Sequence, residues 1–377
     1  MARRRDILVG STAMVLAGRG AWAELPKSSI WTAYDLGSSG YAEASGIADA
    51  IMKKHPMRVR IVPSGTSIGR LLPLKQGKAN YGFLANEIYF ATEGTFDFAA
   101  SSWGPQDLRV ALARPASNAM ATAGDIGVKE MKDLRGKRVG YVKGNPSVNV
   151  KTDAYLAFAG LSRADVEVVW FGSYNAMKTA VINNQLDSYS SVTTSANMRE
   201  IEASPRGLVW PEFPPSDKEG WKRVREVADF FQPYRETAGA GISAEKPREL
   251  VGYRYPIIAS YANADADEVY SLVKAIDESM DLIKNVTGSA KNWDPRMSGK
   301  PPADAPWHEG SIRYLKEKGI WTAEAQDWQE HRLTRLKKVK DGWADARKKF
   351  QGKDDEAWLT YWEEYRVKTL GLRPTAA

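Results

Sequence analysis

Three loops in this chain collect residues that could bind an anion. Each loop follows an expected strand and precedes an expected helix: Gly37-Ser38-Ser39-Gly40-Tyr41, Ser64-Gly65-Thr66-Ser67, and Gly144-Asn145-Pro146-Ser147 with Asn149 close behind. Free backbone N–H groups and the positive end of the helix dipole meet at such turns. Glycine lets a ligand approach closely, and hydroxyl or amide groups add hydrogen-bond donors. The pattern therefore indicates a binding site for a small anion.

The same residue types are also ordinary helix N-caps, so one loop alone favours a capping role. Three such loops in two separate parts of the chain make a shared binding cleft an equally good interpretation. Tyr41, Tyr89 and Tyr174 stand at helix starts or after a strand and could line this cleft. For each of them, packing in the core is the more common role of a tyrosine.

No pattern typical of an enzyme or a metal centre is present in the sequence. The three histidines, His55, His308 and His331, do not have the spacing of metal ligands, and there is no cysteine. The chain contains no G-x-S-x-G nucleophile motif and no complete phosphate-binding P-loop. We therefore expect a protein that is not an enzyme and that needs no cofactor.

Residues 1–23 have the pattern of a signal peptide, with Arg3, Arg4 and Arg5, an apolar segment and a small-x-small cleavage site. The run R-R-D-I-L also fits a twin-arginine signal, and the sequence leaves the export route open. Cleavage would remove four arginines and one aspartate and lower the formal net charge from +7 to +4, too little to favour nucleic acid binding. Without a cysteine there is no disulfide and no lipid anchor. We expect a soluble periplasmic protein.

The elements that would position the loops alternate between strands and helices. Strands are expected at residues 30–36, 57–62, 81–85 and 108–114, the last ended by Pro115, with helices at 41–54 and 68–77. The alternation restarts with strands at 139–142, 166–171 and 186–192 and helices at 148–160 and 175–184. Residues 208–244 have the composition of loops, 253–261 of a strand returning to the first block, and 267–285 of a helix. This order predicts two α/β lobes with parallel sheets.

The C-terminal residues differ from both lobes, because they are charged, helical and rich in tryptophan. The six tryptophans are spread between positions 307 and 362, beside many lysines and arginines. Docking on a membrane or a transporter is one interpretation, and ordinary packing with a solvated basic face is the favoured one. We expect lobe I at residues 28–114 and 245–306, lobe II at 115–244, and a helical extension at 307–377.

Residues 35–84 resemble the start of the TAXI family, the solute receptors of one branch of tripartite ATP-independent periplasmic (TRAP) transporters. The shared features are a glycine-rich turn with a tyrosine, a Ser/Gly turn after the next strand, and a helix ending in Gly-x-Ala-Asp, which is here Gly77-Lys78-Ala79-Asn80. Residues 134–149, 171–189 and 306–321 are similar to later segments of the same family. The resemblance covers most of residues 30–321, and the order of the segments is its most specific feature.

The resemblance implies a type II periplasmic-binding-protein fold, with two α/β lobes joined by a hinge and a ligand in the cleft. It also implies uptake driven by an ion gradient, an integral-membrane TRAP permease as partner, and a carboxylate or amino acid as ligand. Carried over by motif, the expected contacts are Ser39, Gly40, Tyr41, Gly65, Thr66, Ser67, Asn86, Asn145, Ser147, Asn149 and Tyr174. No cleft arginine is identified. A receptor for an ATP-driven importer, a partner of a membrane sensor and an extracytoplasmic enzyme are the alternatives.

Overall fold

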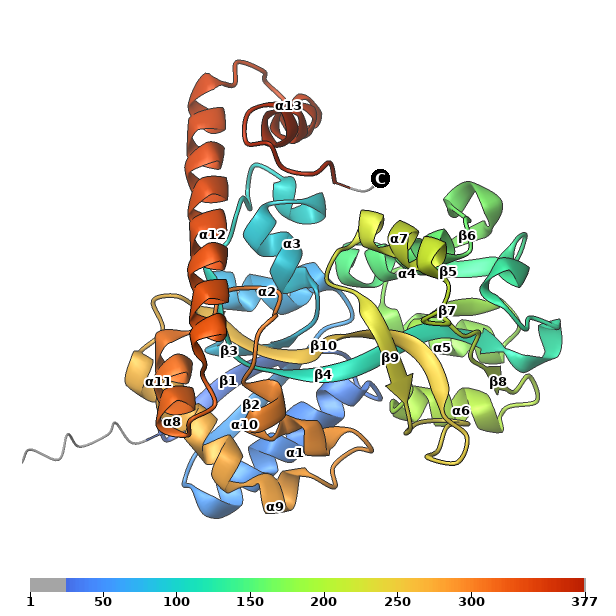
Figure 1. The fold of residues 1–377 in the computed structure, drawn as a ribbon, viewed down its shortest axis with the longest axis horizontal. Helices are drawn as coiled ribbons and strands as arrows, with labels where there is room; N and C mark the ends of the chain where they lie inside the picture. The colour runs from blue at the N-terminus through green and yellow to red at the C-terminus, as the bar shows by residue number, and fades with distance from the viewer. Residues whose placement is uncertain (1–24, 376–377) are drawn as a thin grey trace, which may run out of the picture.

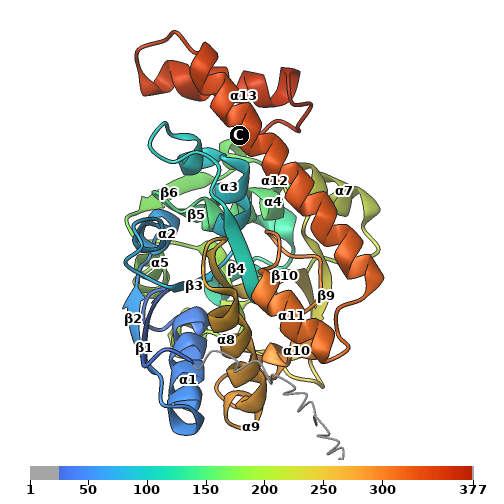
Figure 2. The same ribbon diagram turned by 90° about the vertical axis from the view of Figure 1, so that its left-hand side faces the viewer.

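The computed structural model of the chain describes residues 25–375 (Figure 1). The expected signal peptide and its twin-arginine motif lie outside these residues. The described strands form a ten-stranded arrangement in the order β2-β1-β3-β10-β4-β7-β5-β6, with β8 beside β4 and β9 beside β10. Helices cover the sheet on both sides (Figures 1 and 2). The expected α/β fold of two lobes with a helical C-terminal extension is confirmed.

Lobe I is built on three parallel strands, β1 (Ser28–Ala33), β2 (Arg58–Pro63) and β3 (Tyr81–Leu84). Its helices are α1 (Ser39–Lys54), α2 (Ser67–Lys75), α3 (Glu87–Glu93), α8 (Ala266–Glu278), α9 (Met280–Ile283), α10 (Pro295–Ser298) and α11 (Glu309–Glu317). The first two helices begin at the loops singled out in the sequence, because Ser38 and Thr66 cap them.

Lobe II repeats the pattern with β5 (Arg138–Val142), β6 (Glu167–Phe171) and β7 (Ser188–Ser191), of which β5 pairs in parallel with both others. Two shorter strands are β8 (Leu208–Val209) and β9 (Gln232–Glu236). The helices are α4 (Pro146–Phe158), α5 (Tyr174–Ile182), α6 (Ala196–Ala203) and α7 (Lys218–Val227). The expectation that residues 208–244 are only loops is wrong, since α7 starts there with Asp217 as its cap.

Two long antiparallel strands, β4 (Leu108–Ala123) and β10 (Arg248–Tyr261), run through both lobes. One end of β10 pairs with β3 of lobe I, and the far end of β4 pairs with β7 of lobe II. The prediction that the strand starting at residue 108 ends before Pro115 is wrong, because β4 continues to Ala123. The pairing of β4 with β10 is irregular between Arg254 and Ile257, opposite Pro115, so the missing N–H group of this proline is tolerated there.

The C-terminal extension consists of α12 (Ala323–Lys349), which follows lobe I and projects beyond it, and α13 (Asp355–Lys368), which lies at its far end (Figures 1 and 2). Trp343, Trp358 and Trp362 pack together in a small core of their own. The indoles of Trp358 and Trp362 donate hydrogen bonds to backbone carbonyls of lobe I, at 2.9 and 2.7 Å. These tryptophans therefore anchor the extension rather than face solvent. Within residues 25–375, no helix combines the length and apolar composition that a membrane span needs.

A buried ion pair ties lobe I to the crossing strands. Glu43 on α1 accepts two hydrogen bonds from the guanidinium of Arg114 on β4, at 2.6 and 2.7 Å, and both side chains are almost fully buried. The same carboxylate accepts from Thr287 Oγ1 and Trp293 Nε1, each at 2.7 Å. All the acceptor capacity of Glu43 is thus used, which is the condition for a buried charge to be tolerated.

We expect Glu43→Gln to lower the free energy of unfolding by about 3–5 kcal/mol, because it leaves the Arg114 guanidinium buried without a counter-charge. Urea denaturation monitored by tryptophan fluorescence measures this loss. The control is Asp49→Asn on the same helix, which breaks only an exposed pair with Lys53 and should cost less than about 1 kcal/mol. Equal losses for the two variants would contradict the assigned role of Glu43.

Candidate functional site

A small cavity lies between the lobes. Its volume is about 20 Å³, roughly the room that one water molecule needs. The lining residues are Tyr34, Ser38, Asn118, Val148, Lys151, Tyr174, Ser190, Val192, Ser195, Tyr253 and Tyr255. They come from the ends of β1 and β7, from the starts of α1, α4, α5 and α6, and from the middle of β4 and β10. The cavity therefore lies where both lobes meet the crossing strands.

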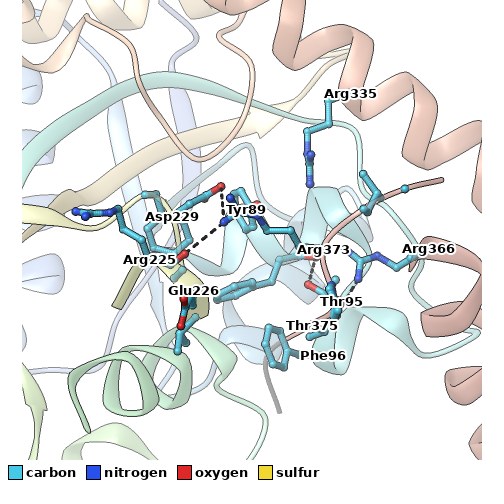
Figure 3. A pocket seen from close by; sticks show the side chains of 17 residues that line it. Tyr89, Thr95, Phe96, Arg225, Glu226, Asp229, Arg335, Arg366, Arg373 and Thr375 are labelled. Atoms are coloured by element: carbon cyan, nitrogen blue, oxygen red, sulfur yellow. Dashed lines mark hydrogen bonds and ion pairs between the residues drawn. The ribbon is translucent and has the colours of Figure 1, made fainter. Parts of the chain in front are cut away.

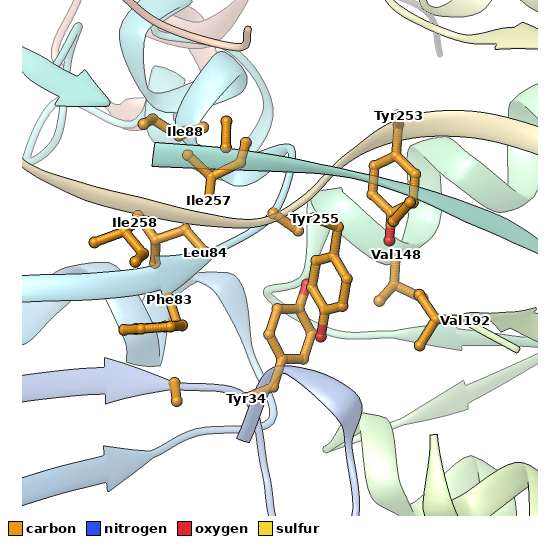
Figure 4. Packing of buried hydrophobic residues seen from close by; sticks show 14 of the residues in the cluster. Tyr34, Phe83, Leu84, Ile88, Val148, Val192, Tyr253, Tyr255, Ile257 and Ile258 are labelled. Carbon is orange, nitrogen blue, oxygen red and sulfur yellow. The ribbon is translucent and has the colours of Figure 1, made fainter. Parts of the chain in front are cut away.

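Four tyrosines form much of its wall, and Figure 4 shows three of them, Tyr34, Tyr253 and Tyr255. Tyr34 stands edge-on to Tyr255 and to Tyr174, with ring centroids 5.4 and 5.9 Å apart, and Tyr253 stacks on Tyr255 at 5.7 Å. Burial raises the pKa of each hydroxyl well above its ordinary value, so all four stay neutral at physiological pH. Neutral tyrosines offer a ligand apolar ring surface together with hydroxyl groups.

Lys151 brings the charge to this cavity. Its side chain is 3% exposed, and its ammonium donates to the carbonyl oxygen and to Oγ of Ser147, at 2.8 and 3.0 Å. The ammonium also lies 4.7 Å from the ring centroid of Tyr253. Among residues 25–375, no carboxylate lies within ion-pair distance of it. Burial lowers the pKa of Lys151 to about 7, although the more distant Glu87 and Asp304 act in the opposite direction.

The other buried charges near Lys151 already have partners. Glu87 accepts from Arg70 at 2.7 Å, and Asp304 accepts from the amide of Asn86 at 2.7 Å. Burial raises the pKa of Asp304 to about 6. Lys151 therefore remains a buried cation whose only direct partners are neutral groups, and Asn118 Oδ1, on the wall of the same cavity, has no hydrogen-bond partner among the described residues.

The loops from the two lobes touch each other, so the structure shows the lobes closed. Asn145 donates to the carbonyl of Gly65 at 3.0 Å and accepts from Ser67 Oγ at 2.8 Å. Nearby, the backbone N–H of Tyr174 also donates to Gly65, at 3.3 Å, and the Asn175 amide donates to the Leu36 carbonyl at 3.0 Å. These cross-lobe bonds close the cleft around the cavity.

The residues predicted from sequence fall into three groups. Tyr174 lines the cavity, while Ser147 holds Lys151 and Gly40 lies so close to the Tyr255 hydroxyl that a Cβ atom would stand 2.5 Å from it. Gly65, Ser67 and Asn145 form the contacts between lobes. The remaining side chains do not line the cavity. Ser39 is buried at the start of α1, Tyr41 packs on the core, Thr66 caps α2, Asn86 binds Asp304, and Asn149 bonds to Val142 in β5.

Sequence reasoning missed Lys151, Asn118 and the tyrosine pair of β10. Lys151 follows Ser147 by one helical turn and shares a buried helix face with Val148 and Tyr155. A lysine on the apolar face of a helix that opens at a predicted ligand loop was therefore a usable signal. Tyr253 and Tyr255 are alternate residues of one strand, which places them on the same face, but which face meets the cleft depends on the tertiary structure.

Metal binding has no support in this part of the molecule. Across residues 25–375, no cluster of three or more histidine, aspartate or glutamate side chains could hold an ion. The cavity lining contains one cationic group, several hydroxyls and no carboxylate. The cationic group favours a ligand that carries a negative charge.

Comparison with known proteins gives one family. The sequence model of the NMT1-like family matches residues 35–319. No curated protein matches the sequence at a significant level.

Among solved structures, the alkanesulfonate-binding protein SsuA from Xanthomonas axonopodis pv. citri, bound to MOPS, is similar over 82% of this chain and 86% of that chain, with 14% identity and a TM-score of 0.41. The substrate-binding protein AbpA of an amino acid ABC transporter from Streptococcus pneumoniae, bound to L-arginine, covers 71% and 93%, with 14% identity and a TM-score of 0.38. PhnD1 from Prochlorococcus marinus, in complex with methylphosphonate, covers 71% and 89%, with 11% identity and a TM-score of 0.42. Likeness at this level does not identify a ligand for this chain.

The cross-lobe bonds of Asn145 predict a more open molecule when they are lost. Asn145→Ser keeps an oxygen that can cap α4 but is too short to reach Gly65 and Ser67. Two lost hydrogen bonds should shift the closed–open balance by about 1–3 kcal/mol, and small-angle X-ray scattering should show a larger radius of gyration. Asn149→Ser is the matched control, because its bonds stay within lobe II. An unchanged radius for Asn145→Ser would contradict the role of these contacts.

Proposed function

The chain belongs to the NMT1-like family, and from this membership and the closed cavity we propose that it is a periplasmic solute-binding protein for a small organic anion. The ligand is a carboxylate or an amino acid, held in the cleft between the lobes. Closed protein then delivers it to the integral-membrane subunits of a TRAP-type permease. No covalent step is part of this mechanism.

The observation that carries the proposal is the buried ammonium of Lys151. A cation removed from water needs a counter-charge or loses its proton, and the residues around this one provide neutral acceptors only. A ligand carboxylate would supply the missing charge. The serine hydroxyls of the cavity would donate hydrogen bonds to the same carboxylate, and Asn118 Oδ1 would accept one from an N–H or O–H group of the ligand.

Closure of the lobes completes the site, because lining residues come from both of them. A ligand bound to one lobe gains the remaining contacts only when the other lobe arrives, so binding favours the closed form. The cavity has room for about one water molecule, so a ligand enters through the open form and holds the lobes further apart than they stand here.

Replacement of Lys151 by methionine tests the site directly. We expect Lys151→Met to raise the free energy of unfolding of the ligand-free protein at pH 7 by about 1–4 kcal/mol, because an uncompensated buried cation is removed. The same variant should weaken binding of the anion about a hundredfold or more. A thermal-shift screen of carboxylates and amino acids identifies the ligand, and titration calorimetry measures its affinity. Lys143→Met, at an exposed position next to α4, is the control. Full anion binding by Lys151→Met would refute the site.

The pH dependence gives an independent prediction. In the unfolded chain a lysine titrates near 10.4, and in the folded protein the pKa of Lys151 is about 7, so the unfolded state binds more protons between these values. The free energy of unfolding of the ligand-free protein should therefore rise from pH 7 to about pH 9, below the range in which unfolded tyrosines ionise. Anion affinity should fall about tenfold for each pH unit above 7, since binding needs the charged ammonium. Both trends should vanish in Lys151→Met, and their persistence there would assign them to another group.

The type of permease is tested by transport. Membrane subunits of a candidate permease from the same organism are reconstituted in vesicles, and uptake of the radiolabelled ligand is measured with this protein outside. We expect uptake that needs an ion gradient and does not need ATP. Uptake that depends on ATP would contradict a TRAP-type partner and support an ATP-driven importer instead.

A further inference from the structure

A second cavity lies where the C-terminal tail meets both lobes (Figure 3). Its volume is about 280 Å³, and it shares no lining residue with the cavity around Lys151. Lobe I contributes α3 and the residues after it, lobe II contributes residues 225–230 at the end of α7 and in the loop that follows it, and the tail contributes residues 371–375. The cavity is therefore complete only when the lobes are closed and the tail is in place.

One side of this cavity is aromatic. Tyr89 lies 5.2 Å from Phe230 of lobe II, and Phe90 lies 4.9 Å from Phe96, measured between ring centroids. Phe90 and Phe230 are 6.3 Å apart and join the two pairs. These rings provide a wall on which a flat apolar group can pack.

The other side carries four arginines, Arg225, Arg335, Arg366 and Arg373, and two carboxylates, Glu226 and Asp229. The buried carboxylate of Glu93 serves three arginines, with Arg335 at 2.7 Å, Arg332 at 3.7 Å and Arg366 at 3.9 Å. Arg366 also binds Glu363 at 3.0 Å and Thr375 at 2.8 Å, but its buried Nε has no hydrogen-bond partner among residues 25–375. Arg335 and Arg366 line the cavity, approaching it from α12 and α13 (Figure 3).

Phe96 adds a sign of conformational strain. Its φ angle is +52°, in the left-handed region that a bulky side chain rarely adopts. Such strain persists only where the surroundings impose it, and it is concentrated at ligand sites and switch regions. Here it occurs at a residue whose ring lines the cavity.

We propose that this cavity is a second binding site, for an amphipathic organic anion whose aromatic body packs on Tyr89, Phe96 and Phe230 and whose carboxylate meets Arg335, Arg366 and Arg373. The ligand touches both lobes, so it binds the closed form better than the open one. Binding of this second ligand therefore strengthens binding of the ligand in the cleft. By thermodynamic linkage, the cleft ligand strengthens binding of the second ligand by the same factor.

Benzoate is the probe, because it combines one ring with one carboxylate. Calorimetry is carried out on the Lys151→Met protein, so that binding in the cleft does not contribute. We expect saturable binding of benzoate and none of benzylamine, which has the same ring but the opposite charge. Arg335→Gln and Arg373→Gln should each weaken it about tenfold. Arg373 is 73% exposed, so its replacement does not threaten the fold. Lys348→Gln, an exposed position on α12, removes the same charge away from the cavity and should change nothing.

Two further results decide the matter. Asn145→Ser, introduced into the same background, opens the lobes without touching this cavity and should weaken benzoate binding. Absence of benzoate binding at millimolar concentration would overturn the proposal. Equal affinities for the Arg335, Arg373 and Lys348 variants would overturn it as well, because they would place benzoate elsewhere. None of these outcomes depends on the ligand of the cleft.

Discussion

The antiparallel pairing of β4 with β10 is the constraint on which the rest of the molecule depends. Each strand belongs to both lobes, so the two sheets share their central strands and cannot separate. The same strands carry Asn118, Tyr253 and Tyr255 into the cavity. The base of the binding site is thus fixed by backbone hydrogen bonds, while its walls come from lobes that can rotate about these strands.

Charge is distributed unevenly around this frame. Arg114 and Arg70 are buried, and each is paired with a buried glutamate. The loop residues Asn145 and Ser67 satisfy each other across the cleft. Lys151 is the exception, with serine and tyrosine as its direct neighbours. Because no carboxylate of residues 25–375 pairs with it, this side chain sets the sign of what the cleft can accept.

Much of the fold could be predicted from the sequence, because the spacing of apolar residues along strands and helices and the glycines at turns are local properties. The strand expected at residues 57–62 differs from β2 by one residue at each end, and the strand expected at 166–171 differs from β6 by one residue at its start. The end expected at Pro115 failed, since whether a missing N–H matters depends on the partner strand. The cavity was harder still. Its loops could be found, and the position of Lys151 on the apolar face of α4 was a local signal, but which face of β10 carries Tyr253 into the cleft depends on the tertiary structure. The export signal, the carboxylate and the permease stay predictions.

The C-terminal extension connects the outer surface of the protein to the relative position of the two lobes. The 27 residues of α12 form a rod about 40 Å long. At its far end, the indole groups of Trp358 and Trp362 on α13 donate hydrogen bonds to lobe I and hold this end in place. From that end the tail returns to lobe II, where Arg373 lies 3.9 Å from Asp229. Any rotation of lobe II moves this contact point relative to the rod. Opening and closing of the cleft are thus coupled to the contact between the C-terminal tail and lobe II on the outer surface of the protein.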